Sequence, residues 1–137
     1  MSQILHTGIA GADLSAYRGY AVRADGADTE RVVLADDSTD TETIGILVGP
    51  GTDESAVEVC IFGVCEAKVG GTIEPYDFLM ADTDGMLIKH TGADAIAIAR
   101  YLAPVKEANG TLSQPDSADG RVAQVFVFGS QIRNPSA

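Results

Sequence analysis

The chain has 137 residues, enough for one domain, and 45% of them are hydrophobic although only 6% are aromatic and none is Trp. Twenty Asp and Glu against nine Lys and Arg give a formal net charge of −11, which disfavours nucleic acid as a partner because its phosphates attract Lys and Arg. No apolar segment approaches the ~20 residues that span a bilayer and the first residues lack the pattern of a signal peptide, so we expect synthesis in the cytoplasm and no membrane partner.

The first sixteen residues show neither a helical period nor the alternation of a strand. We therefore predict an extended N-terminal arm over residues 1–16, with a first strand or a disordered tail as the alternatives. Ile4, Leu5 and Ile9 are apolar residues on this segment. Because an arm of this kind can become ordered on binding, these three residues are candidates for contact with a partner.

Residues 17–129 consist of short apolar runs separated by Gly, Asp and Pro, which predicts a mainly β, single small domain. The Ala residues of 95–102 favour helix and its alternating Ile residues favour strand; its length and the Pro that follows favour strand. A long polar loop at 106–120 and a C-terminal tail at 130–137 complete the prediction. The predicted strands are 20–23, 31–34, 44–48, 57–61, 64–69, 78–81, 86–89, 95–102 and 121–128.

Cys60 and Cys65 are the two cysteines of the chain. In one straight strand a separation of five residues would place them on opposite faces, roughly 16 Å apart at ~3.3 Å per residue. Gly63 allows a bend between them, so a disulfide stays open, but we favour two buried free thiols.

The acidic run 36–42 places oxygen ligands at alternate positions, as a calcium-binding EF-hand loop does. It departs from that pattern at Thr41 and Leu47, where Gly and Glu are required, so we favour a solvated turn. His6 and His90 have no spacing typical of a metal motif or a catalytic triad, and the motif Gly-x-Ser-x-Gly is absent. We expect no catalytic residue, no metal and no cofactor.

Three fragments at 10–14, 17–19 and 128–130 resemble pieces of the dUTP pyrophosphatase family, which is also β-rich and of similar length. In that family the Asp-Leu and Tyr-Arg-Gly motifs lie far apart with an Arg-Ser-Ser motif between them. Here the two are neighbours and the middle motif is missing, so a dUTPase-like nucleotide hydrolase is an alternative interpretation and not the preferred one.

Seven segments between residues 19 and 102 resemble, in order and spacing, the capsid decoration (cement) proteins of tailed bacteriophages. The chain has Tyr76-Asp77 where that family commonly has Gly-Asp, and the loop 106–120 is an elaboration. The matching segments are Gly19-Tyr20-Ala21-Val22, Val32-Val33-Leu34-Ala35-Asp36, Thr43-Ile44-Gly45-Ile46-Leu47, Ala56-Val57-Glu58-Val59, Ala67-Lys68-Val69-Gly70-Gly71-Thr72, Phe78-Leu79-Met80-Ala81-Asp82-Thr83-Asp84-Gly85 and Ala97-Ile98-Ala99.

The resemblance implies a β-barrel-like or β-tulip-like domain that forms homotrimers on the exterior of the expanded capsid, between major capsid protein subunits. It implies a structural virion protein, not an enzyme, whose partners are the major capsid protein and copies of itself. A virion-surface carbohydrate-binding module is a further alternative. If the N-terminal arm makes the contact, deletion of residues 2–14 should abolish capsid binding and leave the domain folded.

Overall fold

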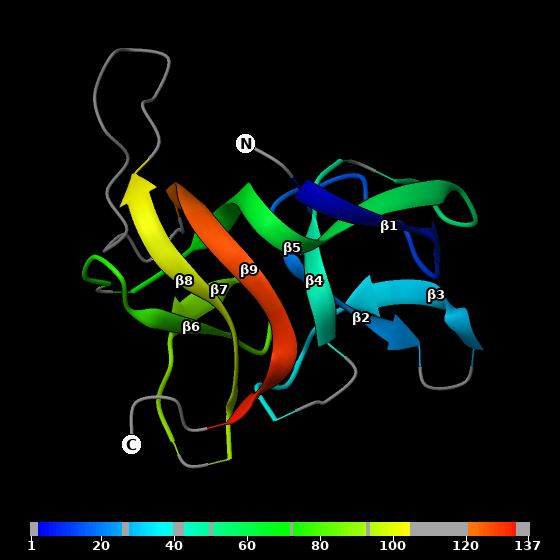
Figure 1. The fold of residues 1–137 in the computed structure, drawn as a ribbon. Helices are drawn as coiled ribbons and strands as arrows, with labels where there is room; N and C mark the ends of the chain where they lie inside the picture. Colours follow the sequence, from blue (N-terminus) through cyan, green and yellow to red (C-terminus); the bar gives the residue numbers. More distant parts are fainter. Residues whose placement is uncertain are drawn as a thin grey trace.

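The computed structural model describes residues 3–25, 28–39, 43–49, 51–71, 73–92, 94–104 and 121–133, and within them it contains strands and no helix (Figure 1). In this part of the chain there is accordingly no helix long and apolar enough to cross a membrane. The strands are β1 (Gln3–Ala10), β2 (Ala21–Asp25), β3 (Asp28–Leu34), β4 (Thr43–Leu47), β5 (Ala56–Val69), β6 (Phe78–Ala81), β7 (Leu87–Lys89), β8 (Ile96–Pro104) and β9 (Arg121–Arg133).

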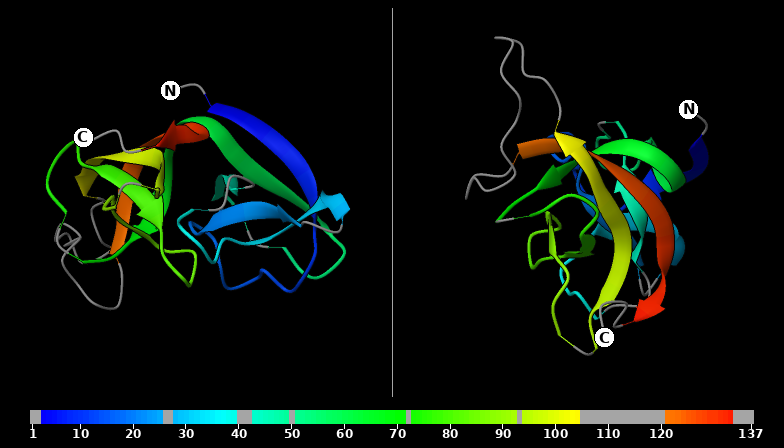
Figure 2. Two further views of the ribbon diagram at one scale, coloured as in Figure 1. Left: turned by 90° about the horizontal axis from the view of Figure 1, so that it is seen from below. Right: turned by 60° about the vertical axis from the view of Figure 1, so that its left-hand side comes forward.

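Strand β5 organises the whole sheet because it pairs with four other strands. The sheet order is β1-β3-β2-β4-β5-β7-β6-β8-β9, with additional pairings of β5 to β1 and to β9. The sheet therefore closes twice: β1, β3, β2, β4 and β5 form one ring, and β5, β7, β6, β8 and β9 form the other. The left view of Figure 2 shows the two rings as two lobes joined by the long strand β5. This arrangement confirms the prediction of a single all-β domain.

The core consists of two clusters of small aliphatic side chains, which we call the first cluster (in the lobe of β6 to β9) and the second cluster (in the lobe of β1 to β4). Strands β2, β4 and β5 lie between the clusters, and where two adjacent residues of a strand enter different clusters the strand is buried on both faces, since neighbouring residues point in opposite directions. Burial on both faces explains why β4 is a continuous apolar run and not an alternating one. In three pairs of adjacent residues, the first-named residue belongs to the first cluster and the other to the second cluster: Ala21 and Val22, Ile46 and Leu47, and Cys60 and Val59.

Gly63 marks the point where β5 changes partners. Its φ of 115° suits glycine, and it pairs with Gln3 of β1 on one side and with Val127 of β9 on the other. The change of direction brings Cys60 and Cys65 into the same first cluster. Strand β5 is therefore not straight, and Gly63 provides the bend that the sequence allows; the expectation of two buried free thiols is confirmed.

The Cys60 thiol donates to the carbonyl oxygen of Phe62 at 3.6 Å. Interaction with the Cys60 thiol, followed by burial, raises the pKa of Cys65, and interaction with the Cys65 thiol lowers the pKa of Cys60. Because burial of both sulfurs denies access to reagents, we expect neither thiol of the native protein to react with an aromatic disulfide reagent on a time scale of minutes at pH 8. Both should react at once in guanidinium chloride. Rapid release of one equivalent from the native protein would contradict the buried placement.

The N-terminal segment is a strand and not the predicted arm. Residues 3–9 pair antiparallel with β5, and Ile9 and Ala10 pair parallel with β3. Ala10 and Leu14 are also members of the second cluster. Deletion of residues 2–14 would therefore remove a strand and two core side chains, and we expect it to unfold the domain that it was expected to leave folded.

The remaining predicted strands occur where the sequence indicates them. The hairpins β2–β3 and β6–β7 are both antiparallel, and residues 96–104 form a strand, not a helix. At the C-terminus β9 continues to Arg133, so the predicted tail begins too early. The predicted loop 106–120 and residues 134–137 lie outside the described residues.

Candidate interaction surface

The three residues that the sequence marks for partner contact are exposed on β1. The exposed fractions of Ile4, Leu5 and Ile9 are 56%, 45% and 36%, and Phe62, the cross-strand partner of Ile4 on β5, is 48% exposed. Side chains directly opposite each other in an antiparallel pair lie on the same face of the sheet. Ile4 and Phe62 therefore form one apolar area at the outer face of the β1–β5 pair.

Strand β1 has an open edge along most of its length. Among the described residues, 3–8 pair only with β5, and pairing with β3 begins at Ile9. The strand is held in place by side chains as well: Gln3 Nε2 donates to the carbonyl oxygen of Val64 at 2.7 Å, and Thr7 Oγ1 donates to Glu58 Oε1 at 2.7 Å. An uncharged open edge flanked by exposed apolar side chains is a surface suited to a partner.

All four phenylalanines of the chain lie on the outer face of the sheet, and none belongs to either cluster. The ring centroids of Phe62 and Phe126 are 5.2 Å apart, those of Phe126 and Phe128 are 6.4 Å apart, and those of Phe128 and Phe78 are 6.0 Å apart. We call these four residues the aromatic row. It crosses β5, β9 and β6 and continues the apolar area of Ile4.

Arg100 of β8 closes the far end of the aromatic row. Its guanidinium carbon lies 4.6 Å from the centroid of the Phe78 ring, and its Nε and Nη2 atoms donate to the carbonyl oxygen of Tyr76 at 3.1 and 3.0 Å. These contacts hold the guanidinium over the ring, which is a favourable place for a cation. The surface thus has an apolar end at Ile4 and a cationic end at Arg100.

Sequence reasoning missed the aromatic row because its members come from three strands that are far apart in the chain. Phe126 alternates with Val125 and Val127, both fully buried, so its ring must point to the opposite face. Two features of the sequence could have indicated the aromatic row. Phe126 and Phe128 are two residues apart, which places both on one face of a strand. The aliphatic residues are also numerous enough to fill a core without any Phe.

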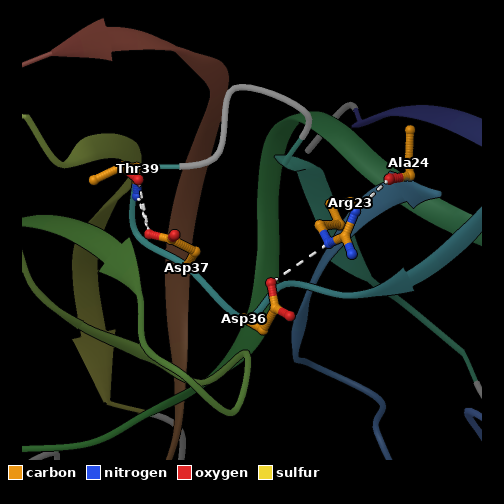
Figure 3. Close-up of polar contacts among 5 residues, drawn as sticks. All are labelled: Arg23, Ala24, Asp36, Asp37 and Thr39. Carbon is orange, nitrogen blue, oxygen red and sulfur yellow. Dashed lines mark hydrogen bonds and ion pairs between the residues drawn. The ribbon is translucent and has the colours of Figure 1, made fainter. Parts of the chain in front are cut away.

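The acidic run after β3 forms a turn held by its own side chains, as Figure 3 shows. Asp36 Oδ1 lies 3.5 Å from Nε of Arg23, and Asp37 Oδ1 accepts hydrogen bonds from the backbone nitrogen and Oγ1 of Thr39 at 2.9 and 2.8 Å. Residues 40–42 lie outside the described residues. Within the described residues, no group of three or more His, Cys, Asp or Glu side chains is placed to hold a metal ion.

The hydrogen bonds that Thr39 donates to Asp37 make the stability of the fold depend on pH in the acidic range. Its backbone and side-chain hydrogen bonds lower the pKa of Asp37, so the folded pKa lies below the unfolded one. The stabilisation is present above about pH 4 and is lost as the pH falls through the folded pKa. We expect Asp37→Asn to lower stability at pH 6 and to leave it unchanged at pH 2, measured by urea unfolding. An equal loss at both pH values would contradict this account.

The two histidines lie in different surroundings. His90 is buried, and its Nε2 atom is bonded to the carbonyl oxygen of Ala95 at 2.9 Å, which is a structural contact. His6 lies on the exposed part of β1.

Comparison with known proteins reveals likeness in fold alone. No family model matches the chain, and no curated protein matches it in sequence. Among solved structures, the fold is similar to that of a phage fiber base. One of the matching structures is the crystal structure of the head fiber gp8.5 N base of bacteriophage phi29, with a TM-score of 0.59 and 14% sequence identity over 96% of this chain and 100% of that chain.

Proposed function

We propose that the chain is a structural virion protein that binds the outer surface of the expanded phage capsid as a homotrimer and stabilises contacts between major capsid protein subunits. The observation that carries the proposal is the likeness in fold to a phage head fiber base over nearly the whole chain. The order of the seven sequence segments that resemble capsid decoration proteins supports the same role. Neither argument requires a catalytic residue.

The surface of β1 and the aromatic row supply the contact. A protein that binds only the mature shell stabilises that shell by mass action, and a trimer repeats one weak contact three times at high effective concentration. Ile4, Leu5 and Phe62 are half exposed in a chain of net charge −11. Burial of such residues against the capsid would remove apolar area from water without placing carboxylates at the centre of the contact.

Substitution on β1 tests this contact. We expect Ile4→Asp with Leu5→Asp to reduce co-sedimentation with expanded capsids by about a hundredfold, because each Asp would bring an unpaired carboxylate into an apolar contact. Thr83→Asp is the matched control, since it adds the same kind of charge at an exposed residue of the β6–β7 turn, outside β1 and the aromatic row. Circular dichroism reports whether both variants fold. Undiminished binding of a folded double variant would contradict the assignment of β1.

The proposed trimer has its own test, which is sedimentation equilibrium at different salt concentrations. Identical chains of net charge −11 repel each other, and salt screens this repulsion over about 8 Å at physiological ionic strength. We therefore expect the trimer to tighten as salt rises. A monomer at every concentration and salt would contradict self-association in solution.

A further inference from the structure

A groove lies on the opposite side of the molecule from the β1–β5 pair. It is formed by the segment 11–20, the β2–β3 hairpin and the β6–β7 turn, and has a volume of about 880 Å³. In the left view of Figure 2 the segment 11–20 crosses the side away from β1. The volume falls in the range of about 300–1,000 Å³ that small-molecule sites occupy. The polar and aromatic side chains of its lining include Asp13, Tyr17, Tyr20, Arg23, Asp36 and Asp84.

The wall of the groove is preformed although segment 11–20 is neither helix nor strand. Backbone nitrogens of this segment donate to strands and loops around it: Gly11 to Val32 at 2.8 Å, Leu14 to Gly51 at 2.7 Å, and Gly19 to Leu47 at 2.7 Å. The Leu14 side chain is only 1% exposed. A loop tied down in this way holds its side chains in fixed places, so binding would not have to order it.

Two aromatic rings stand in this wall. The ring centroids of Tyr17 and Tyr20 are 5.2 Å apart and their planes meet at 87°, so they present two faces at a right angle. The backbone nitrogen of Tyr20 donates to the carbonyl oxygen of Tyr17 at 3.0 Å, and that of Tyr17 donates to Leu14 at 3.1 Å. Tyrosine offers an apolar ring for packing and a hydroxyl for hydrogen bonding.

The charged groups of the groove are mostly negative. Four carboxylates, of Asp13, Asp25, Asp36 and Asp84, accompany the one guanidinium of Arg23 among the lining residues. Arg23 is positioned by Asp36 at 3.5 Å and by the carbonyl oxygen of Ala24, to which its Nη1 donates at 3.1 Å (Figure 3). Phosphorylated, sulfated or carboxylated ligands would be repelled by this excess of negative charge.

We propose that this groove binds an oligosaccharide that is neutral or bears amino groups. Carboxylates accept hydrogen bonds from hydroxyl and ammonium groups, an arginine donates to ring and hydroxyl oxygens, and aromatic faces pack against the apolar face of a sugar ring or a nearby cation. Tyr17, Tyr20 and Asp36 supply these elements around one space. If the chain sits on a capsid through β1, the groove points away from the shell; this orientation rests on the proposed function, but binding to the groove does not.

The test is isothermal titration of the full chain with three panels of oligosaccharides: neutral glucose and N-acetylglucosamine oligomers, glucosamine oligomers, and polygalacturonate as the anionic panel. We expect saturable binding to a member of the first two panels and none to the third. Tyr17→Ala and Asp36→Asn should each weaken binding at least about tenfold, and Tyr17→Phe, which keeps the ring, should weaken it less. The matched controls Tyr76→Asn and Asp53→Asn lie outside the groove and should bind like the unaltered chain.

Thermal unfolding of each variant separates loss of the site from loss of the fold. Three results would each overturn the proposal. The chain could bind none of the saccharides, or it could bind the anionic panel alone. Folded Tyr17 and Asp36 variants could also retain binding in full. Tighter binding of a lysine-rich peptide than of any saccharide would overturn it as well. Because no capsid is present, the result is independent of whether the chain attaches to one.

Discussion

The Gly45→Ala variant is expected to be among the least stable single variants of this protein. Gly45 lies in β4 between β2 and β5, and a Cβ atom at this position would be 2.1 Å from the carbonyl oxygen of Cys60 and 3.1 Å from Cγ1 of Val59. The obstacle is backbone of a central strand, which cannot move aside without breaking the pairing of both lobes. We expect a loss of about 3 kcal/mol or more, at the upper end for overpacked cores, and a melting temperature lower by roughly 10 °C.

Gly49→Ala provides the matched control for this prediction. It lies four residues further along, and a Cβ atom there would have no atom within 4 Å. The substitution should therefore leave stability unchanged or raise it by about 0.5 kcal/mol through the entropy of the unfolded chain. Equal melting temperatures for the two variants, measured by circular dichroism, would contradict the close approach of β4 to β5.

Truncation of the core at β4 should have the second largest effect. Ile46 and Leu47 are both fully buried, and they point into the first and second clusters respectively. Ile46→Ala and Leu47→Ala should each cost about 2–5 kcal/mol, because a cavity adds to the lost transfer free energy. Leu5→Ala, on the exposed part of β1, should cost less than about 1 kcal/mol.

The two core variants also test whether the lobes unfold together. Strands β4 and β5 contribute to both clusters, so neither lobe can lose its core without exposing part of the other. We expect one unfolding transition in urea, shifted to lower concentration by both variants. Two separate transitions, with only one moved by each variant, would show that the lobes are independent.

Most strands could be predicted because each carries its own local signal. The alternation at 57–61 and the Gly-bearing turn at 82–85 both lie within a few residues, and Gly85 has the positive φ of 86° that such a turn requires. The run 44–48 also predicted a strand, but its burial on both faces depends on a second lobe that no local pattern reveals.

Strand β1 could not be predicted because its own residues carry no local signal of a strand. Its first five residues, 3–7, are all exposed, so no buried face imposes an alternation on them. The strand forms because β5 offers a long partner, which is a property of the fold and not of residues 1–16. Ile4, Leu5 and Ile9, which the sequence marks as candidates for partner contact, are exposed, and their role in binding stays a proposal.

The aromatic row and the groove depend on residues brought together from distant parts of the chain. Tyr17 lies in a segment whose apolar residues follow no helical or strand period. Asp84 lies in a turn, and the turn alone explains why acidic residues are found there. Periodicity identifies which face of a strand is buried; it does not identify which outer faces meet.

Co-sedimentation of the unaltered chain with capsids is the most direct test of the proposed role. Under the proposal the chain is encoded by a phage, and expanded and unexpanded capsids of that phage that lack the protein would each be mixed with increasing amounts of it and pelleted. We expect saturable binding to expanded capsids, little binding to unexpanded ones, and greater resistance of the bound shell to heat. Absence of binding to both forms of capsid would contradict the central claim.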